Sequence, residues 1–173
     1  RGVIDVYILF FIHIGTRRVY VSGVSSQPDA NWVTQQARNF CMTSEEWNLP
    51  GSMLIIDHDS KYSKGFDSVL ESENVEVKRV GPRAPNMNAY AERWVQSLRK
   101  ECLDFFLILG EKHLWHLVKE YEAHFNEERP HQGIGNKPIL GEEIEPEDVL
   151  PFPTKVNCHE RLGGLLKSYS RAA

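Results

Sequence analysis

The chain has 173 residues, an ordinary hydrophobic content and a formal net charge of −4. This length suits one domain with a core of its own and leaves room for a short appendage. The negative net charge excludes a uniformly basic coat for nucleic acid, although it permits a local basic groove. The longest apolar run, Val6–Ile12, is far shorter than the ~20 residues of a membrane-spanning helix, which argues against a membrane protein.

The three cysteines, Cys41, Cys102 and Cys158, lie far apart and show neither metal-type spacing nor a disulfide framework. A reducing, cytoplasmic compartment is therefore expected. The chain begins at Arg1, without Met and without a signal-peptide pattern, in what reads as the lead-in to a strand. We therefore expect a fragment of a longer protein.

Residues 6–14 are β-branched and aromatic on both faces, which indicates a strand buried inside a sheet. A Gly-Thr turn and an alternating segment at 17–24 follow, so a hairpin is predicted. Alternation places three residues on one face of its second strand: Val19, Val21 and Gly23. The next segments predict a helix capped by Asp29, a strand at 53–56 and a helix after Asp57. They are followed by a predicted strand at 75–80, an irregular turn at 81–87, and helices at 88–102 and 112–127.

This order of elements predicts an α/β domain with a mixed sheet and helices on both faces. Residues 141–153 are acidic and proline-rich, which is typical of an extended connector. We therefore expect one folded domain over 1–140 and an extended C-terminal tail over 141–173.

Two acids stand where a metal site would be useful. Asp57 follows an apolar strand directly, a position that is both rigid and open to substrate. Glu92 lies one turn into the helix predicted at 88–102, on the side away from its apolar positions. Carboxylates are the ligands that Mg²⁺ prefers, and two such ions roughly 4 Å apart commonly serve phosphoryl transfer on nucleic acid. Taken singly, Asp57 and Asp59 could equally be turn formers and Glu92 a solvated helix residue.

Three motifs together resemble the integrase core of the DDE transposases, a retroviral-integrase-like superfamily with an RNase H-like fold. In bacterial insertion-sequence members the second acid opens an Asp-x-x-Ser-x-Tyr motif, and the third follows an Asn-rich turn. The matching stretches here are Asp57-x-x-Ser60-x-Tyr62, Pro85-Asn86-x-Asn88-x-x-x-Glu92 and Phe125-Asn126-Glu127-Glu128-Arg129-Pro130-His131. The resemblance covers residues 4–140.

The resemblance implies a mixed five-stranded RNase H-like sheet flanked by helices, and an enzyme that cleaves DNA and transfers strands with two Mg²⁺ or Mn²⁺ ions. Asp57 and Glu92 would be its second and third catalytic, metal-binding acids. Transposon ends and target DNA would be the partners of a homo-oligomer in the bacterial cytoplasm, at the nucleoid. Contacts with DNA would come from Asn86, Asn88, Gln96, Arg99, Lys100 and Arg83.

The first acid of the family lies on a strand upstream of Val6, and Asp5 stands only at the start of the second strand. The resemblance therefore implies a truncated first strand, a catalytic core over 1–140 that is incomplete at its N-terminus, and unpaired strand edges. Two alternatives stay open: a catalytically incomplete remnant that binds DNA, and an RNase H-like nuclease that only cleaves. For Arg129 and His131, three readings stay open: they fix the last helix, they touch DNA, or their segment is a plain helix stop that uses Pro130.

Basic residues recur along the chain and could form a phosphate-binding stripe or a solvated face. They are Arg17, Arg18, Lys78, Arg79, Arg83, Arg93, Arg99 and Lys100.

Overall fold

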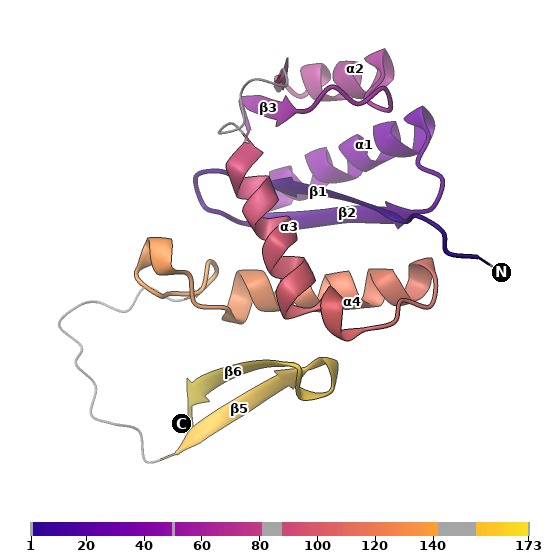
Figure 1. Ribbon diagram of the computed structural model, residues 1–173. Coiled ribbons are helices and arrows are strands. Elements are labelled where there is room, and N and C mark those ends of the chain that lie inside the picture. The colour runs from indigo at the N-terminus through magenta and orange to yellow at the C-terminus, as the bar shows by residue number, and fades with distance from the viewer. Residues whose placement is uncertain (1, 50, 81–87, 142–154, 173) are drawn as a thin grey trace.

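The structure, a computed structural model, describes residues 2–49, 51–80, 88–141 and 155–172 and is a mixed α/β fold (Figure 1). The helices and strands predicted before residue 128 are present close to their expected bounds. No helix in these ranges is long and apolar enough to cross a membrane. The helices are α1 (Ala30–Glu46), α2 (Lys64–Ser72), α3 (Ala89–Glu101) and α4 (Glu111–Ala123), and the strands are β1 (Tyr7–Ile12), β2 (Val19–Ser25), β3 (Met53–Ile56), β4 (Glu76–Arg79), β5 (Val156–Arg161) and β6 (Leu166–Arg171).

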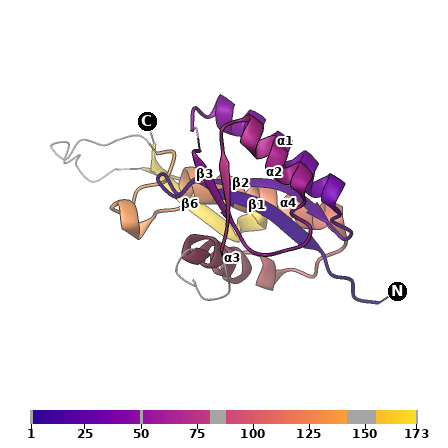
Figure 2. The ribbon, with the colours of Figure 1, turned by 90° about the horizontal axis from the view of Figure 1, so that it is seen from above.

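The hairpin of β1 and β2 is covered on both faces, as its apolar sequence predicts. Alternate side chains of a strand point to opposite faces. Phe10 therefore meets Trp94 of α3, with ring centroids 4.2 Å apart, while Phe11 stacks on Phe40 of α1 at 4.0 Å. Seen from above, the strands lie between α1 and α3 (Figure 2).

Two apolar cores result, one on each side of the strands. The first joins the hairpin to α3 and α4, and the second joins α1 and α2 to the pair β3–β4. Buried members of the first include Val19, Val21, Trp94, Leu98, Leu117 and Tyr121, and the second comprises Val33, Ala37, Ile56, Phe66, Leu70 and Val75.

Side chains rather than another strand complete the outer edge of β2. The Val19 N–H donates to Asn126 Oδ1 at 3.0 Å, and Asn126 Nδ2 donates to the Val19 carbonyl at 2.8 Å. The Val21 N–H donates to Glu122 Oε1 at 3.0 Å. Buried backbone groups need such partners. Helix α4 and the π-helical turn His124–Glu128 that follows it therefore close this edge of the sheet.

The expected single sheet is not present among the described residues. Their strands form three two-stranded sheets: β1 pairs with β2 antiparallel, β3 with β4 parallel, and β5 with β6 antiparallel. No ladder joins β1 to β3 in this part of the chain, because a cavity separates the remaining edges of these two strands. The mixed α/β class is confirmed, whereas the continuous five-stranded sheet is not seen.

A bulge in β2 makes the predicted face of Gly23 wrong. The pairing with β1 skips Ser22, which lies between the paired residues Val21 and Gly23. One extra residue turns the remainder of a strand to its other face. A Cβ atom at Gly23 would meet the Trp32 ring of α1 at 2.9 Å, so the absence of a side chain permits the close approach of α1.

The C-terminal residues form a hairpin where an extended tail was expected. Strands β5 and β6 lie beside α4 (Figure 1), and Leu166 is only 4% exposed. Gly163 and Gly164 both have positive φ, of 67° and 89°, and supply the turn between the strands. The expectation is therefore wrong for 156–171, and residues 142–154 of the expected connector lie outside the described ranges.

Candidate metal and nucleic-acid site

Asp57 stands at the end of a fixed strand. It follows Ile56 directly, and its side chain is exposed whereas Ile56 is buried. The Val80 N–H donates to the Ile56 carbonyl at 2.8 Å, which extends the parallel pairing of β3 and β4 up to the acid. The backbone of Asp57 is therefore held in place, while its carboxylate is exposed to a ligand.

Asp59 is bound within its own turn. Its carboxylate accepts hydrogen bonds from the backbone N–H and from Nζ of Lys61, both at 2.9 Å, and these bonds lower the pKa of Asp59. Burial, together with the charges of Asp57 and Asp59, raises the pKa of Tyr62 to about 12. No hydrogen bond joins the Asp57 carboxylate to another described residue. Of the two acids, Asp57 is therefore the one open to a metal ion.

The predicted faces of α3 are present in the structure. Trp94 and Leu98 are 1% and 2% exposed, whereas the predicted metal and DNA residues of this helix are exposed: Glu92, Gln96, Arg99 and Lys100. Arg99 and Lys100 also occupy the last turn of α3, where a positive charge stabilises the helix through its dipole. Their presence there is therefore explained whether or not DNA is bound. Asn88 is the N-cap residue and makes no side-chain capping bond. Arg83 and Asn86 lie outside the described residues.

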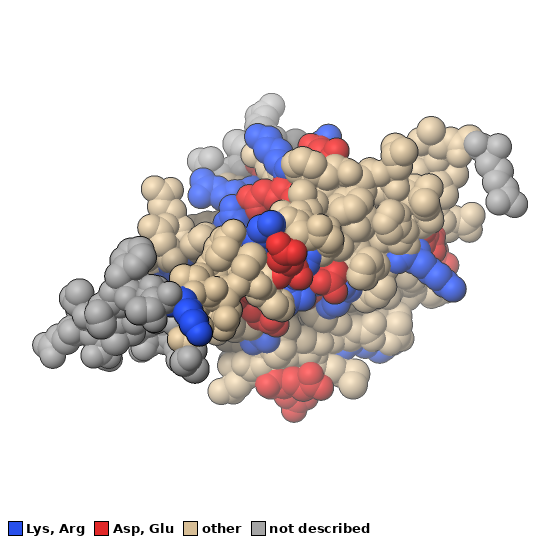
Figure 3. Space-filling model, turned by 90° about the horizontal axis from the view of Figure 1, so that it is seen from below, with Lys and Arg blue, Asp and Glu red and all other residues tan. Residues whose placement is uncertain are grey.

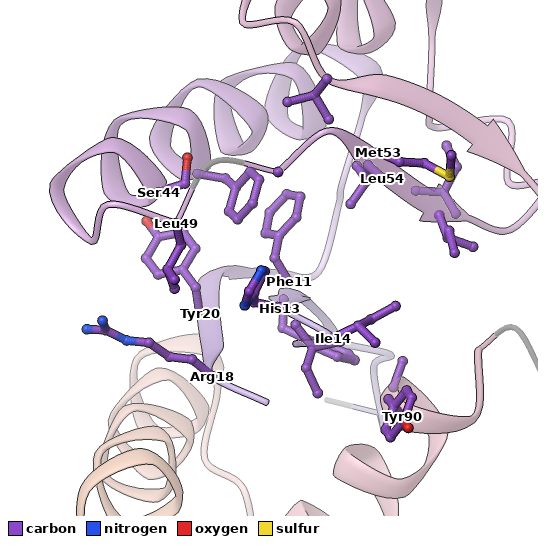
Figure 4. Close-up of a pocket in the computed structure, with 18 of the residues that line it drawn as sticks. Phe11, His13, Ile14, Arg18, Tyr20, Ser44, Leu49, Met53, Leu54 and Tyr90 are labelled. Carbon is purple, nitrogen blue, oxygen red and sulfur yellow. The ribbon is translucent and has the colours of Figure 1, made fainter. Parts of the chain in front are cut away.

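Asp57 and the start of α3 border one cavity of about 430 Å³ between β1 and β3 (Figure 4). Asn88 and Tyr90 of the α3 segment line it, together with consecutive residues of both strands, 8–14 and 53–56. Consecutive residues alternate between the two faces of a strand, so this lining shows that strand edges border the cavity. Two unpaired edges and the predicted metal ligand thus face the same space.

The hydrogen-bonding groups that point into this cavity follow from the register. Val19 and Val21 direct their N–H groups away from β1, toward α4. Their partners on β1 are Ile12 and Phe10. Directly opposed residues of an antiparallel pair either bond to each other or both point outward. The N–H and C=O groups of Phe10 and Ile12 therefore face the cavity.

The acids near this cavity are of the type that binds a hard cation, but too few of them come together among the described residues to hold one. Carboxylate oxygens are the donors that Mg²⁺ and Mn²⁺ prefer. Within the described ranges, no group of three or more His, Cys, Asp or Glu could hold a metal ion. Asp57 and Asn88 share the cavity, whereas Glu92 follows a lining residue, Ala91, and is not itself part of the lining. A further oxygen ligand is needed to complete the set.

Arg129 ties α3 to the end of α4. Its Nε and Nη2 donate to Glu101 at 2.9 and 2.7 Å, and Tyr121 donates to the same carboxylate at 2.9 Å. Burial alone would raise the pKa of Glu101, but the bonds from Arg129 and Tyr121 outweigh it and lower that pKa. His131 Nε2 donates to the Phe125 carbonyl at 2.8 Å, and burial lowers the pKa of the ring. These contacts support the reading in which Arg129 and His131 fix the last helix.

Comparison with known families gives a match over the C-terminal half of this site. The family model described as an integrase core domain matches residues 73–138, which include β4, α3 and α4. Over these residues the chain is similar to an integrase core domain. The match covers Glu92 and the Arg129 segment, whereas Asp57 lies before its first residue.

Two known proteins, one similar in sequence and one similar in fold, can be compared with the chain. An uncharacterized 39.2 kDa protein of insertion element IS476 from Xanthomonas euvesicatoria is 28% identical over 76 residues, which cover 44% of this chain and 22% of that protein. A chain of the cryo-EM structure of the simian T-cell lymphotropic virus intasome, in complex with the PP2A regulatory subunit B56 gamma, has a TM-score of 0.56 at 13% identity. That likeness covers 97% of this chain and 68% of the other, and it is a likeness of fold.

Proposed function

We propose that this chain is an integrase core and the catalytic part of an insertion-element transposase, which cleaves DNA and joins DNA strands with divalent metal ions. The observation that carries the proposal is the meeting of Asp57 and the start of α3 at one cavity. The named relatives, an insertion-element protein and an intasome chain, support DNA as the substrate. Transposon ends and target DNA would be its partners, and a homo-oligomer its working form.

Asp57 and Glu92 are the residues that would hold the ions, Mg²⁺ or Mn²⁺. Bound there, the metal would stabilise charge on a phosphate and lower the pKa of an attacking hydroxyl. The contribution of the chain is to hold the metal-binding carboxylates in position. Asp57 is fixed by β3, Glu92 by the buried opposite face of α3, and the hydrogen bonds of Lys61 keep Asp59 out of the ligand set.

The remaining ligand is inferred from the cavity between β1 and β3. We infer that an extended segment pairs with both edges, joins the two sheets into one five-stranded RNase H-like sheet, and brings an acid beside Asp57. Two observations support this: the outward groups of Phe10 and Ile12, and the apolar side chains that surround the space, among them Phe11 and Leu54 (Figure 4).

The test is a strand-transfer assay with pre-cut DNA ends, using the protein expressed from its complete reading frame. Asp57→Asn and Glu92→Gln should each reduce strand transfer by about 10³-fold or more, because each removes a metal ligand, while the affinity for DNA stays within twofold. EDTA should abolish the reaction. The matched controls are Asp59→Asn, whose carboxylate is engaged with Lys61, and Glu71→Gln on the exposed face of α2. Strand transfer that survives in either ligand variant would refute the assignment.

One alternative has an observation in its favour. The described residues contain no three-ligand acidic cluster, which is what a DNA-binding remnant without chemistry would show. This alternative predicts ordinary DNA affinity and no nicking with Mg²⁺ or Mn²⁺. A nuclease of the RNase H type would cleave but leave pre-cut ends unjoined, so strand transfer and nicking of uncut DNA, measured together, separate all three functions.

A further inference from the structure

A second cavity, of about 470 Å³, lies beside the one that Asp57 borders. Ile12 and Tyr90 line both cavities, so the two spaces are neighbours. On α3, Ala91 lines the first cavity and Arg93 the second, and Glu92 stands between them in the sequence. Any ligand of the second cavity would therefore lie next to the proposed metal site.

The second cavity is positively charged. Its lining contains Arg17, Arg93 and Arg129, and no Asp or Glu among the described residues. Arg129 is neutralised by its two bonds to Glu101, which lies outside the lining. His131 adds no charge when its ring is neutral, the state that burial favours. Arg17 and Arg93 remain as the sources of positive potential.

Two residues that line this cavity each carry a buried donor with no partner among the described residues. The donors are Nη1 of Arg17 and Nε1 of Trp94, whose side chain is 1% exposed. Buried polar atoms are satisfied in the great majority of cases, so a pair of orphans at one cavity calls for an explanation. Guanidinium and indole nitrogens can only donate hydrogen bonds. The missing partner must therefore be an acceptor, and the surrounding charge favours an anionic one.

Arg17 is held in place before any ligand arrives. Its guanidinium lies 3.6 Å from the ring centroid of Tyr90, a cation–π contact that fixes the planar group. Its backbone has φ 68°, which is uncommon for a residue with a side chain, and its N–H donates to the His13 carbonyl at 2.7 Å. A turn that fixes an unpartnered cation against a cavity lowers the entropy lost on binding.

We propose that this second cavity binds a phosphate group of a nucleic-acid strand. The phosphate oxygens would accept hydrogen bonds from Arg17 Nη1 and Trp94 Nε1, and Arg93 would add charge. The volume leaves room for the adjoining nucleoside, and the exposed ring of Tyr90, which lines the cavity, suits its base. The choice of DNA as the source of the phosphate rests on the proposed function, whereas the anion site itself rests on the cavity alone.

The first experiment follows the indole N–H signal of Trp94 in the ¹H–¹⁵N spectrum of the full chain, with EDTA present. The probes are inorganic phosphate and the dinucleotide d(TpT), which carries one phosphodiester. The Trp94 signal should move with d(TpT), because its N–H gains an acceptor, while the signals of Trp32, Trp47 and Trp115 stay in place. A Trp94 signal that moves with neither probe would overturn the proposal. A shift with inorganic phosphate alone would overturn the assignment to nucleic acid.

The second experiment uses variants that remove charge at constant side-chain bulk. Arg17→Met should weaken d(TpT) binding about tenfold, the size expected for hydrogen bonds to a charged group. It should also reduce the slope of log affinity for single-stranded DNA against log salt by about 0.7. Arg93→Met, at an exposed position that does not disturb folding, should weaken binding several-fold. Arg38→Met, exposed on α1 and remote from the cavity, is the matched control and should change nothing.

The outcomes for the two proposals are separable. Loss of strand transfer in Asp57→Asn with an intact Trp94 shift leaves both standing. Absence of strand transfer in every variant, with an Arg17-dependent Trp94 shift, refutes the transposase and retains the anion site. Normal strand transfer combined with unchanged d(TpT) binding in Arg17→Met refutes the anion site alone.

Discussion

Asn126 satisfies both backbone groups of Val19 with one side chain, in a position that is 5% exposed. An alanine there leaves a buried N–H and a buried C=O without partners. Asn126→Ala should therefore lower the free energy of unfolding by about 2–4 kcal/mol. Urea unfolding measures the loss, and Asn31→Ala on the exposed side of α1 is the control. A loss no larger than that of the control would show that water can replace the amide.

Sequence patterns predict residues well where their partners are local. Asp29 was expected to cap α1, and its Oδ1 accepts from the Trp32 N–H at 2.7 Å, three residues away. The partner of Asn126 is 107 residues distant, so no local pattern signals its role. Its place in the Phe125–His131 motif marked it as notable, but not as the cap of a strand. Arg17 was named only within a basic stripe, because its contact with Tyr90 depends on the tertiary fold.

At the level of elements, Glu128 is the centre of the ion pairs that attach the β5–β6 hairpin, and Arg161 also pairs with Glu120 at 3.2 Å. Glu128 accepts hydrogen bonds from Arg161 Nε and His159 Nδ1 of β5, both at 2.8 Å, and from His124 Nδ1 at 2.9 Å. Seen from below, this side of the molecule carries acidic and basic side chains interspersed (Figure 3). The attachment is therefore an ion-pair network laid over the buried contact of Leu166.

This network predicts a loss of stability in acid. Burial alone would raise the pKa of Glu128, but the bonds from His124 and Arg161 outweigh it and lower that pKa. A carboxyl whose pKa is lowered by folding stabilises the protein above its unfolded pKa of about 4.3 and ceases to do so as the pH falls through the folded value. Glu128→Gln should thus lower the melting temperature by several degrees at pH 7, and by much less at pH 3.

Melting curves at the two pH values, with Glu71→Gln as the exposed control on α2, measure the difference. An equal loss of stability at pH 3 and pH 7 would contradict the ion-pair account and point to packing alone.

Local periodicity explains which elements were predictable. The helices carry apolar residues at helical spacing, so their bounds follow from sequence to within a few residues. The β5 strand is exposed along nearly its whole length and shows no apolar face. The hairpin is stabilised by the contacts of Arg161 and Leu166 with α4 and the turn after it. These are tertiary contacts, so no sequence pattern within 155–172 predicts them. The bulge at Ser22 was missed for a similar reason, since alternation assumes an unbroken ladder.

At the level of the whole molecule, the cavity between β1 and β3 makes a prediction about exchange. The N–H groups of Phe10 and Ile12 face the cavity, so their amide hydrogens should exchange quickly in the chain of residues 1–173. They should become protected when an extended segment pairs there, as expected for the protein from its complete reading frame. Val19 and Val21, bonded to Asn126 and Glu122, are internal controls and should be protected in both proteins.

Equal exchange of Phe10 and Ile12 in the two proteins would refute the fifth strand. The sequence predicted the strands and the acid at the end of β3, and the family resemblance predicted one five-stranded sheet with a truncated first strand. Neither showed that the two pairs stand apart around a cavity, because that depends on how α1 and α3 hold them. The sequence also could not show which basic residues are free to bind phosphate. Arg79 donates to Asp67 at 2.8 and 2.9 Å, and the Arg18 guanidinium lies over the Trp47 ring, and both contacts depend on the tertiary fold.

The polar closure of β2 has a consequence for self-association. Since Asn126 and Glu122 occupy the outward groups of Val19 and the outward N–H of Val21, a second molecule finds no continuous hydrogen-bonding row on that side. The other edge of the hairpin, at β1, faces the cavity between β1 and β3, where the proposed extended segment would pair. With that segment in place, both edges of the hairpin are occupied, and strand addition by a second molecule is blocked on either side.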